Sequence, residues 1–246
     1  MSALQQMQPN AHKPRLERSG IKRSGINRII QVFVTVLVMG VVLFLSAGRF
    51  DWIAAWIFLG LYVLAILTLG VWAMRKNPDV VNERGRMAKN VKSWDKILMT
   101  TYTLVLFVLF AVAGLDAGRF GSSVMPAVVQ VIGFAGVALA IALTYWAMAT
   151  NPFLSALVRI QDDRGHHVIT AGPYRYVRHP MYAATLILWP CIALALGSWW
   201  ALIPAAAIVI IFVIRTALED RTLQAELPGY AEYAQHVRYR LVPGLW

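Results

Sequence analysis

Six long apolar runs constrain this chain more than any other feature. Charged or Gly- and Pro-containing sequence separates them, and they cover residues 29–47, 53–74, 97–115, 124–149, 181–196 and 199–216. A helix that crosses a bilayer core about 30 Å thick needs roughly 20 apolar residues. Hydrophobic residues make up 59% of the 246 residues and charged residues 14%, whereas soluble domains hold about 45–50% and about 25%. The pattern predicts an all-α integral membrane protein with about six transmembrane helices.

The last two runs are short, and only Gly197 and Ser198 join them, so we expect a short helical hairpin there. Pro190 and Pro204 predict kinks in its two helices. The runs divide the chain into a basic tail (1–28), four transmembrane helices (29–149) with a basic loop (75–96), and a C-terminal region (150–246). This region comprises a loop (150–180), the hairpin (181–216), and a cytoplasmic helix and tail (217–246). Gly133 and Gly136 suit close helix packing.

Positive charge alternates along the chain. Twenty of the 23 Lys and Arg fall in the N-terminal tail, the 75–96 and 150–180 connections and the C-terminal tail. Because cytoplasmic loops are enriched in Lys and Arg, we expect these segments and both termini in the cytoplasm. Contact with anionic lipid explains the net charge of +11. The tail lacks the interleaved aromatics of a single-strand nucleic-acid binder, so no nucleic-acid partner is expected. Compact length and a missing retention signal favour a bacterial inner membrane.

Two polar stretches stand out in the C-terminal part. In the first, residues 172–182, Pro180 restricts His179 and suits the first turn of the following helix. Arg178 and His179 would therefore lie near a helix N-terminus, whose free N–H groups attract anions. A basic, aromatic membrane interface that binds no ligand is the alternative interpretation.

The second stretch, residues 215–226, is expected to continue the last helix into the cytoplasm. Its spacing places Arg215, Glu219, Thr222 and Glu226 on one helix face. Asp220 is rotated about 100° from that face. Charges at the end of a membrane helix are costly unless they are paired or functional. The simpler alternative is an exposed Arg215–Glu219 pair that contributes only tenths of a kcal/mol.

Several motifs follow one another in a fixed order. They are Gly172-Pro173-Tyr174, Arg178-His179-Pro180-Met181-Tyr182, Arg215 before Glu219-Asp220, Tyr230-Ala231-Glu232-Tyr233 and Arg240-Leu241-Val242-Pro243-Gly244. Through them, residues 161–246 resemble the C-terminal half of the isoprenylcysteine carboxyl methyltransferase family of integral membrane enzymes, to which the phosphatidylethanolamine methyltransferases are also similar. The basic loop, with Glu83-Arg84-Gly85 and Lys92-Ser93-Trp94-Asp95, resembles bacterial members less diagnostically.

The resemblance implies S-adenosylmethionine (SAM) as the methyl donor, with no metal. It makes residues 150–246 the catalytic region, with a cytoplasmic C-terminal segment that binds the cofactor. The residues that it assigns to the cofactor are Tyr174, Tyr176, Arg178, His179, Pro180, Tyr182, Glu219 and Asp220. Arg178 and His179 suit the cofactor carboxylate, Glu219 its ammonium or ribose diol, and the tyrosines its adenine or sulfonium. The catalytic residues are expected to be Arg215, which orients an anionic acceptor, and Glu219. Asp220 stands where the family has a second glutamate, so it either reaches the cofactor or serves only Arg238 or Arg240.

The acceptor stays open at this point. A lipophilic or a small thiol or carboxylate acceptor fits, among them a prenylated cysteine, a phospholipid amine, a small thiol or a fatty acid. Two other functions compete with methyl transfer. Membrane sterol-type reductases, which bind NADPH, share an Arg-His-Pro-x-Tyr run, and a non-catalytic membrane protein is the third hypothesis. His166 and His167 are adjacent and lack a third ligand at useful spacing, so no metal site is expected.

Overall fold

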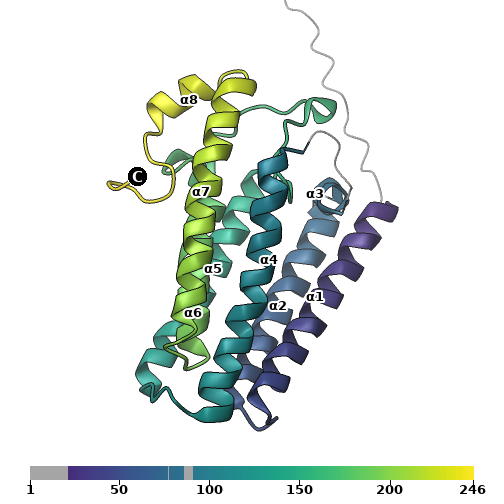
Figure 1. The fold of residues 1–246 in the computed structure, drawn as a ribbon. Helices are drawn as coiled ribbons and strands as arrows, with labels where there is room; N and C mark the ends of the chain where they lie inside the picture. Colours follow the sequence, from purple (N-terminus) through teal and green to yellow (C-terminus); the bar gives the residue numbers. More distant parts are fainter. Residues whose placement is uncertain (1–21, 77, 86–90) are drawn as a thin grey trace, which may run out of the picture.

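The computed structural model describes residues 22–76, 78–85 and 91–246 as a bundle of helices (Figure 1). The long helices are α1 (Arg23–Ala47), α2 (Ile53–Lys76), α4 (Ser93–Ala113), α5 (Ala127–Thr150), α6 (Pro180–Ala195) and α7 (Leu202–Glu226). Shorter elements are α3 (Pro78–Arg84), the π-helix η2 (Gly114–Phe120), the 3-10 helices η3 (Asp162–Arg164) and η4 (Gly172–Arg175), and α8 (Tyr230–His236). The described residues contain no strand, which confirms the all-α prediction.

Five helices are long and apolar enough to cross a membrane. They are α1, α2, α4 with η2, α5 and α7. The predicted sixth span forms α6, which has 16 residues and at 1.5 Å per residue is about 24 Å long. This is shorter than a bilayer core of about 30 Å. The last helix has 25 residues and ends at Glu226, so it continues through the polar stretch 215–226, as the sequence suggested. The hairpin therefore pairs the short α6 with the longer α7.

The N-terminal boundaries also differ from the prediction. Helix α1 begins at Arg23, inside the predicted tail, and residues 1–21 lie outside the described residues. The predicted loop at 75–96 contains α3, and its residues 77 and 86–90 are outside the described part as well. The chain therefore continues as helix beyond the apolar runs at several bilayer boundaries.

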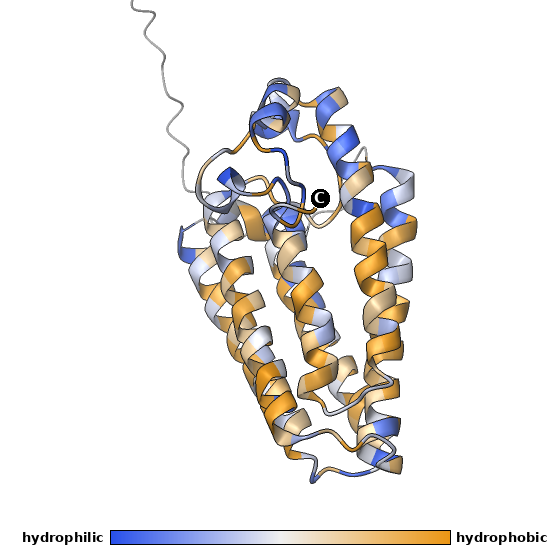
Figure 2. Cartoon of the chain, turned by 90° about the vertical axis from the view of Figure 1, so that its left-hand side faces the viewer, coloured by the Kyte–Doolittle hydropathy of each residue, from blue (hydrophilic) through white to orange (hydrophobic). Residues whose placement is uncertain are grey.

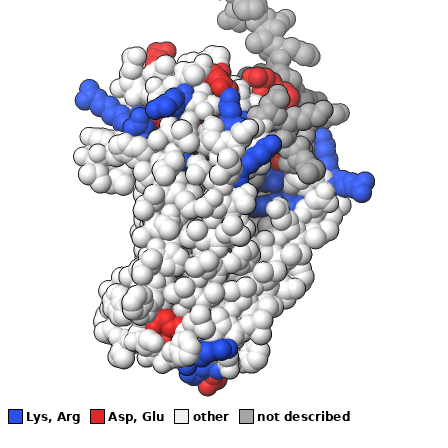
Figure 3. All heavy atoms as spheres, viewed as in Figure 1, with Lys and Arg blue, Asp and Glu red and all other residues white. Residues whose placement is uncertain are grey.

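The surface agrees with a membrane environment. Large apolar side chains are exposed along the long helices, including Phe33, Ile53 and Val131 at 70%, 73% and 64%. Figure 2 shows these helices as mostly hydrophobic along their middle, and on the face in Figure 3 the charged side chains gather at the two ends. Lipid covers such a band without the cost of exposing it to water. The chain is therefore an integral membrane protein.

Two glycines of α5 allow α6 to pack closely against it. A Cβ at Gly133 would lie 2.4 Å from the backbone nitrogen of Ala195, and one at Gly136 would lie 2.3 Å from Sγ of Cys191. Only glycine permits this approach, which confirms that the small residues serve close helix packing. On the other side, the Tyr102 ring contacts the rings of Trp189 and Phe212 edge-on and ties α4 to α6 and α7. The start of α6, with His179 and Pro180, lies at the end of the bundle that carries α3 and α8 (Figure 1).

Candidate functional site

A cavity opens at this end of the bundle. Its walls come from the loop that contains residues 151–169, from η4, from the start of α6, the end of α7 and α8. The predicted site residues that line it are Tyr174, Arg178, His179, Pro180, Tyr182, Arg215 and Glu219. Asp220 is buried and is not among the residues that line the cavity. Tyr176 is 57% exposed, with its ring 6.3 Å from that of Trp146, and does not reach the cavity. Sequence reasoning missed Phe153, His166 and Tyr233, which also line the cavity.

Local sequence explains how the His179 segment is positioned. Gly172 has a φ of +57°, and a Cβ there would lie 2.5 Å from Oγ1 of Thr150, so only glycine fits before η4. Pro180 occupies the first turn of α6, where its missing N–H costs nothing. The backbone N–H groups of Arg178 and His179 donate to the carbonyls of Tyr239 and Arg240 at 3.0 and 2.9 Å. The C-terminal segment is therefore fastened along the entry to α6.

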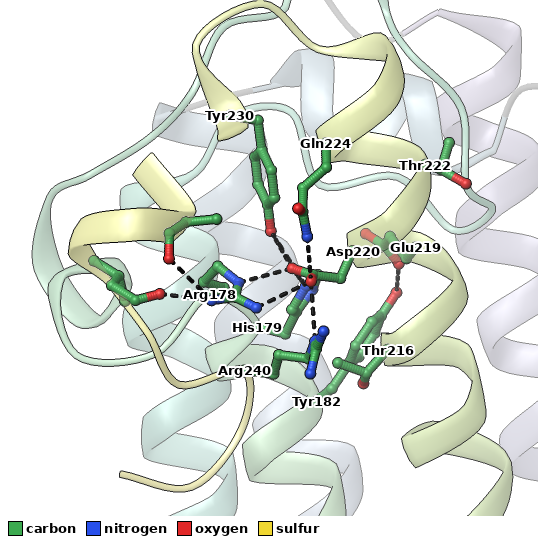
Figure 4. A network of polar contacts seen from close by, with 12 residues as sticks. Arg178, His179, Tyr182, Thr216, Glu219, Asp220, Thr222, Gln224, Tyr230 and Arg240 are labelled. Atoms are coloured by element: carbon green, nitrogen blue, oxygen red, sulfur yellow. Dashed lines mark hydrogen bonds and ion pairs between the residues drawn. The ribbon is translucent and has the colours of Figure 1, made fainter. Parts of the chain in front are cut away.

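Asp220 is the centre of a buried polar network (Figure 4). Its side chain is 0% exposed, and Nε and Nη2 of Arg178 donate to its two oxygens at 2.7 and 3.0 Å. Its other partners are Nε2 of His179 at 3.2 Å, Oη of Tyr230 at 2.9 Å, Nε of Arg240 at 2.9 Å and Nε2 of Gln224 at 2.9 Å. The network joins α7, α8 and the C-terminal segment to the start of α6.

These contacts occupy Arg178. Its Nη1 donates to the carbonyls of Val237 and Arg238 at 2.7 and 2.9 Å, while Asp220 takes its other donors. Burial alone would lower the pKa of Arg178, but its hydrogen bonds and ion pair with Asp220 raise the pKa above its ordinary value. Arg178 and Asp220 are thus committed to each other, and Asp220 also serves Arg240, one of the two partners that the sequence suggested.

Tyr182 joins His179 to Glu219. Its hydroxyl donates to Oε2 of Glu219 at 2.5 Å, and its ring lies parallel to the His179 ring with centroids 5.8 Å apart. Among the described residues, Oε1 of Glu219 and Nδ1 of His179 have no hydrogen-bond partner, and both residues line the cavity. An acceptor oxygen and a ring nitrogen are therefore available to a bound molecule.

Arg215 is paired with a residue that the sequence did not single out as a site residue. Its Nε and Nη2 donate to the two oxygens of Asp95 at 2.7 and 3.2 Å, and Nη2 also donates to the carbonyl of Ala156 at 3.1 Å. Asp95 is 0% exposed, and its Oδ2 accepts the Val158 N–H at 2.7 Å. The Arg215–Glu219 pair, the simpler alternative that the sequence offered, is not present among the ion pairs of the described residues. Asp95 could have been found from the sequence, because an acidic residue in the first turn of a membrane helix is costly unless it is paired.

His166 is a titratable residue in the wall of the cavity. Its ring lies 4.8 Å from the Phe153 ring, and Nδ1 accepts the Gln161 N–H at 3.4 Å. Burial, reinforced by the neighbouring His167, lowers the pKa of His166 to about 4. Since an unfolded histidine titrates near pH 6.5, the unfolded state binds the proton first, and stability contributed by neutral His166 is lost as pH falls from about 6.5 to about 4.

We therefore expect His166→Asn, which keeps an acceptor but does not titrate, to lose less stability on acidification than wild type. Thermal unfolding in detergent between about pH 7 and pH 4.5 measures the difference. His236→Asn is the matched control, because His236 is exposed on α8, away from His166, and its Nδ1 hydrogen-bonds the Glu232 carbonyl. Parallel acid profiles for wild type and His166→Asn would contradict this assignment.

The family model for phospholipid methyltransferases matches residues 128–227, which contain most of the cavity lining. The cobalt-zinc-cadmium resistance protein CzcN of Cupriavidus metallidurans is 28% identical over 137 residues, covering 52% of this chain and 56% of the relative. The match thus spans about half the length of that relative. Within the described residues, no group of three or more His, Cys, Asp or Glu is placed to hold a metal ion. The family match confirms the resemblance seen in the motifs, and with the apolar helices it supports a membrane methyltransferase.

Proposed function

We propose, taking the phospholipid methyltransferase match as the premise, that this protein transfers a methyl group from SAM to an acceptor at the membrane interface. One observation carries the proposal. Within the matched stretch, His179, Tyr182 and Glu219 converge on a single cavity at the polar end of an apolar bundle. A methyl donor that carries charge requires polar groups, whereas a lipophilic acceptor requires access from lipid, and this location offers both.

The cavity lining suits the chemical groups of SAM. The donor carries a carboxylate, an ammonium, a ribose diol, an adenine and a sulfonium. Oε1 of Glu219 suits the ammonium or the diol, His179 suits the carboxylate, and the aromatic faces of Tyr174 and Phe153 suit the adenine. Because Asp220 occupies Arg178, we assign Arg178 and Asp220 to positioning His179. Tyr176 has no place at the cavity in this assignment.

When bound, SAM supplies an electrophilic methyl group, and the chain supplies alignment in a site shielded from water. Arg215 lines the cavity, and its Nη1 has no hydrogen-bond partner among the described residues. We assign this N–H group to an anionic acceptor and Glu219 to the donor beside it. A carboxylate or thiolate acceptor needs no general base, whereas an amine would lose its proton to Glu219.

The proposal also assigns the membrane orientation. The positive-inside bias places the cavity end and both termini in the cytoplasm, with residues 150–246 as the catalytic region. A bacterial inner membrane remains our proposed location. The acceptor, lipophilic or a small thiol or carboxylate, would enter from the lipid bilayer, which is the one partner that the proposal requires.

Calorimetric titration of the detergent-purified protein tests the proposal. We expect wild type to bind SAM, and His179→Ala and Glu219→Ala to bind it at least ~10-fold more weakly, because each loses a charge-assisted contact worth about 1.5–3 kcal/mol. His236→Ala and Glu232→Ala are the matched controls, since both residues are exposed on α8. Binding of NADPH in place of SAM would favour the reductase, and binding of neither, or unchanged affinity in both variants, would defeat the proposal.

A further inference from the structure

Arg84 is a cation without an anion. It is the last residue of α3 and half-buried, and its Nε is buried without a hydrogen-bond partner. Its contacts are two thioethers, with Nη1 3.8 Å from Sδ of Met148 and Nη2 3.6 Å from Sδ of Met181. Sulfur is a weak acceptor. No ion pair to Arg84 occurs among the described residues, although leaving a buried cation uncompensated is costly.

The neighbouring residues hold Arg84 in this position. Glu83 points elsewhere and pairs with Arg159, Oε1 to Nη2, at 2.7 Å. A Cβ at Gly85 would lie 1.8 Å from the Ser24 carbonyl oxygen, so the end of α3 is pressed against the start of α1. The guanidinium is therefore directed by the fold toward α5 and α6, and its exposure to methionines is a feature of the packing.

The surroundings of Arg84 adjoin the proposed methyl-transfer site. Met181 lines the candidate cavity and directly precedes Tyr182, whose hydroxyl binds Glu219. Burial, and then the positive charges of Arg28 and Arg215, lower the pKa of Arg84 to about 10. Arg84 is still a cation at neutral pH. The region between α1, α3 and α6 therefore concentrates positive charge next to the cavity. The flexible side chains of the two methionines can move to admit a ligand.

We propose that Arg84 binds the anionic head group of a lipid methyl acceptor, a carboxylate or a phosphate, beside Met181. This inference rests on the proposed function. A guanidinium recognises either anion through paired N–H donors, and its Nε is the donor that still lacks an acceptor. Two sources supply this chemistry in a membrane, a fatty acid and an anionic phospholipid.

The test measures thermal stabilisation in maltoside micelles doped with oleate, phosphatidylglycerol or uncharged diacylglycerol. We expect oleate or phosphatidylglycerol, and not diacylglycerol, to stabilise wild type by mass action. Which anionic lipid acts identifies the source. Arg84→Gln should weaken the apparent affinity ~10-fold or more, as expected for loss of a charge-assisted contact. Arg221→Gln, which removes an exposed cation from the C-terminal part of α7, should keep it. Equal stabilisation of wild type and Arg84→Gln, or no stabilisation of wild type by either anion, would overturn the proposal.

Two further measurements separate this inference from a structural role and from the proposed function. Without lipid, Arg84→Met should melt at or above the wild-type temperature, because it removes an uncompensated charge. A large loss of stability would instead make Arg84 a structural residue and sink the proposal. Calorimetric SAM affinity of Arg84→Gln should stay within about twofold of wild type, since Arg84 is not in the cavity lining. Failure of wild type to bind SAM would count against the proposed function alone.

Discussion

Replacing Asp220 by asparagine is expected to destabilise the protein by about 3–5 kcal/mol. Asp220 is fully buried and receives two hydrogen bonds from Arg178, whose own side chain is 5% exposed. The variant leaves the Arg178 guanidinium buried without its counter-ion. The amide group of the asparagine also places N–H donors against the donors that now bind Asp220. The loss is large because the cost of an unpaired buried charge exceeds the net worth of the pair.

Arg240→Gln provides the comparison within the same network. Its side chain is 33% exposed and also bonds Asp220, at 2.9 Å. Because water replaces part of this interaction, we expect a loss of about 1 kcal/mol or less. Thermal or chemical unfolding in detergent gives both losses. Hydrogen exchange should locate the effect of Asp220→Asn at residues 178–179 and 237–241, where backbone hydrogen bonds join the C-terminal segment to α6. Similar losses for Asp220→Asn and Arg240→Gln would refute the buried-charge argument.

The fold was predictable to the extent that hydropathy reports the bilayer. Runs of about 20 apolar residues identify spans because lipid satisfies no backbone hydrogen bond, so each run must be a helix. Helix ends were less predictable. The start of α1 at Arg23 lies before its apolar run, where hydropathy gives no signal, whereas the polar helical spacing of residues 215–226 did indicate that α7 continues to Glu226. The short α6 carries an apolar run but lacks the length of a span.

The candidate site was predictable as a location but not as a set of pairs. The motifs predicted that residues near 172–182 and 215–220 meet, and most of them do line one cavity. Spacing along one helix suggested that Arg215 pairs with Glu219, yet Arg215 pairs with Asp95, 120 residues earlier. Likewise Arg178 meets Asp220 across 42 residues. Partners on separate elements depend on how the helices pack, and local periodicity carries no information about that.

Asp95→Ala is the second variant with a large expected effect. Asp95 is the fully buried counter-ion of Arg215, and it also accepts the Val158 N–H, so it ties α4 to α7 and to the loop that lines the cavity. Its removal should cost about 3–5 kcal/mol, as for any buried pair that loses one partner. The double variant Asp95→Ala/Arg215→Met should lose less than the sum of the two single losses, because it leaves no orphaned charge. Strict additivity in unfolding experiments would show that the two residues do not depend on each other.

A second substitution at Asp95 tests the role that we assign to Arg215. If Asp95 holds Arg215 so that Nη1 faces the acceptor, mild misplacement should reduce the chemical step more than cofactor binding. A milder change, Asp95→Asn, is therefore expected to lower methyl transfer from labelled SAM into a host lipid extract ~10-fold or more, since small misplacements of a positioning group cost up to about 100-fold. The SAM affinity measured by calorimetry should change by less than about threefold, because the substitution does not contact the proposed cofactor site. Equal losses of SAM affinity and transfer would instead place Arg215 in the cofactor site, because a group that binds donor and transition state alike alters both by one factor.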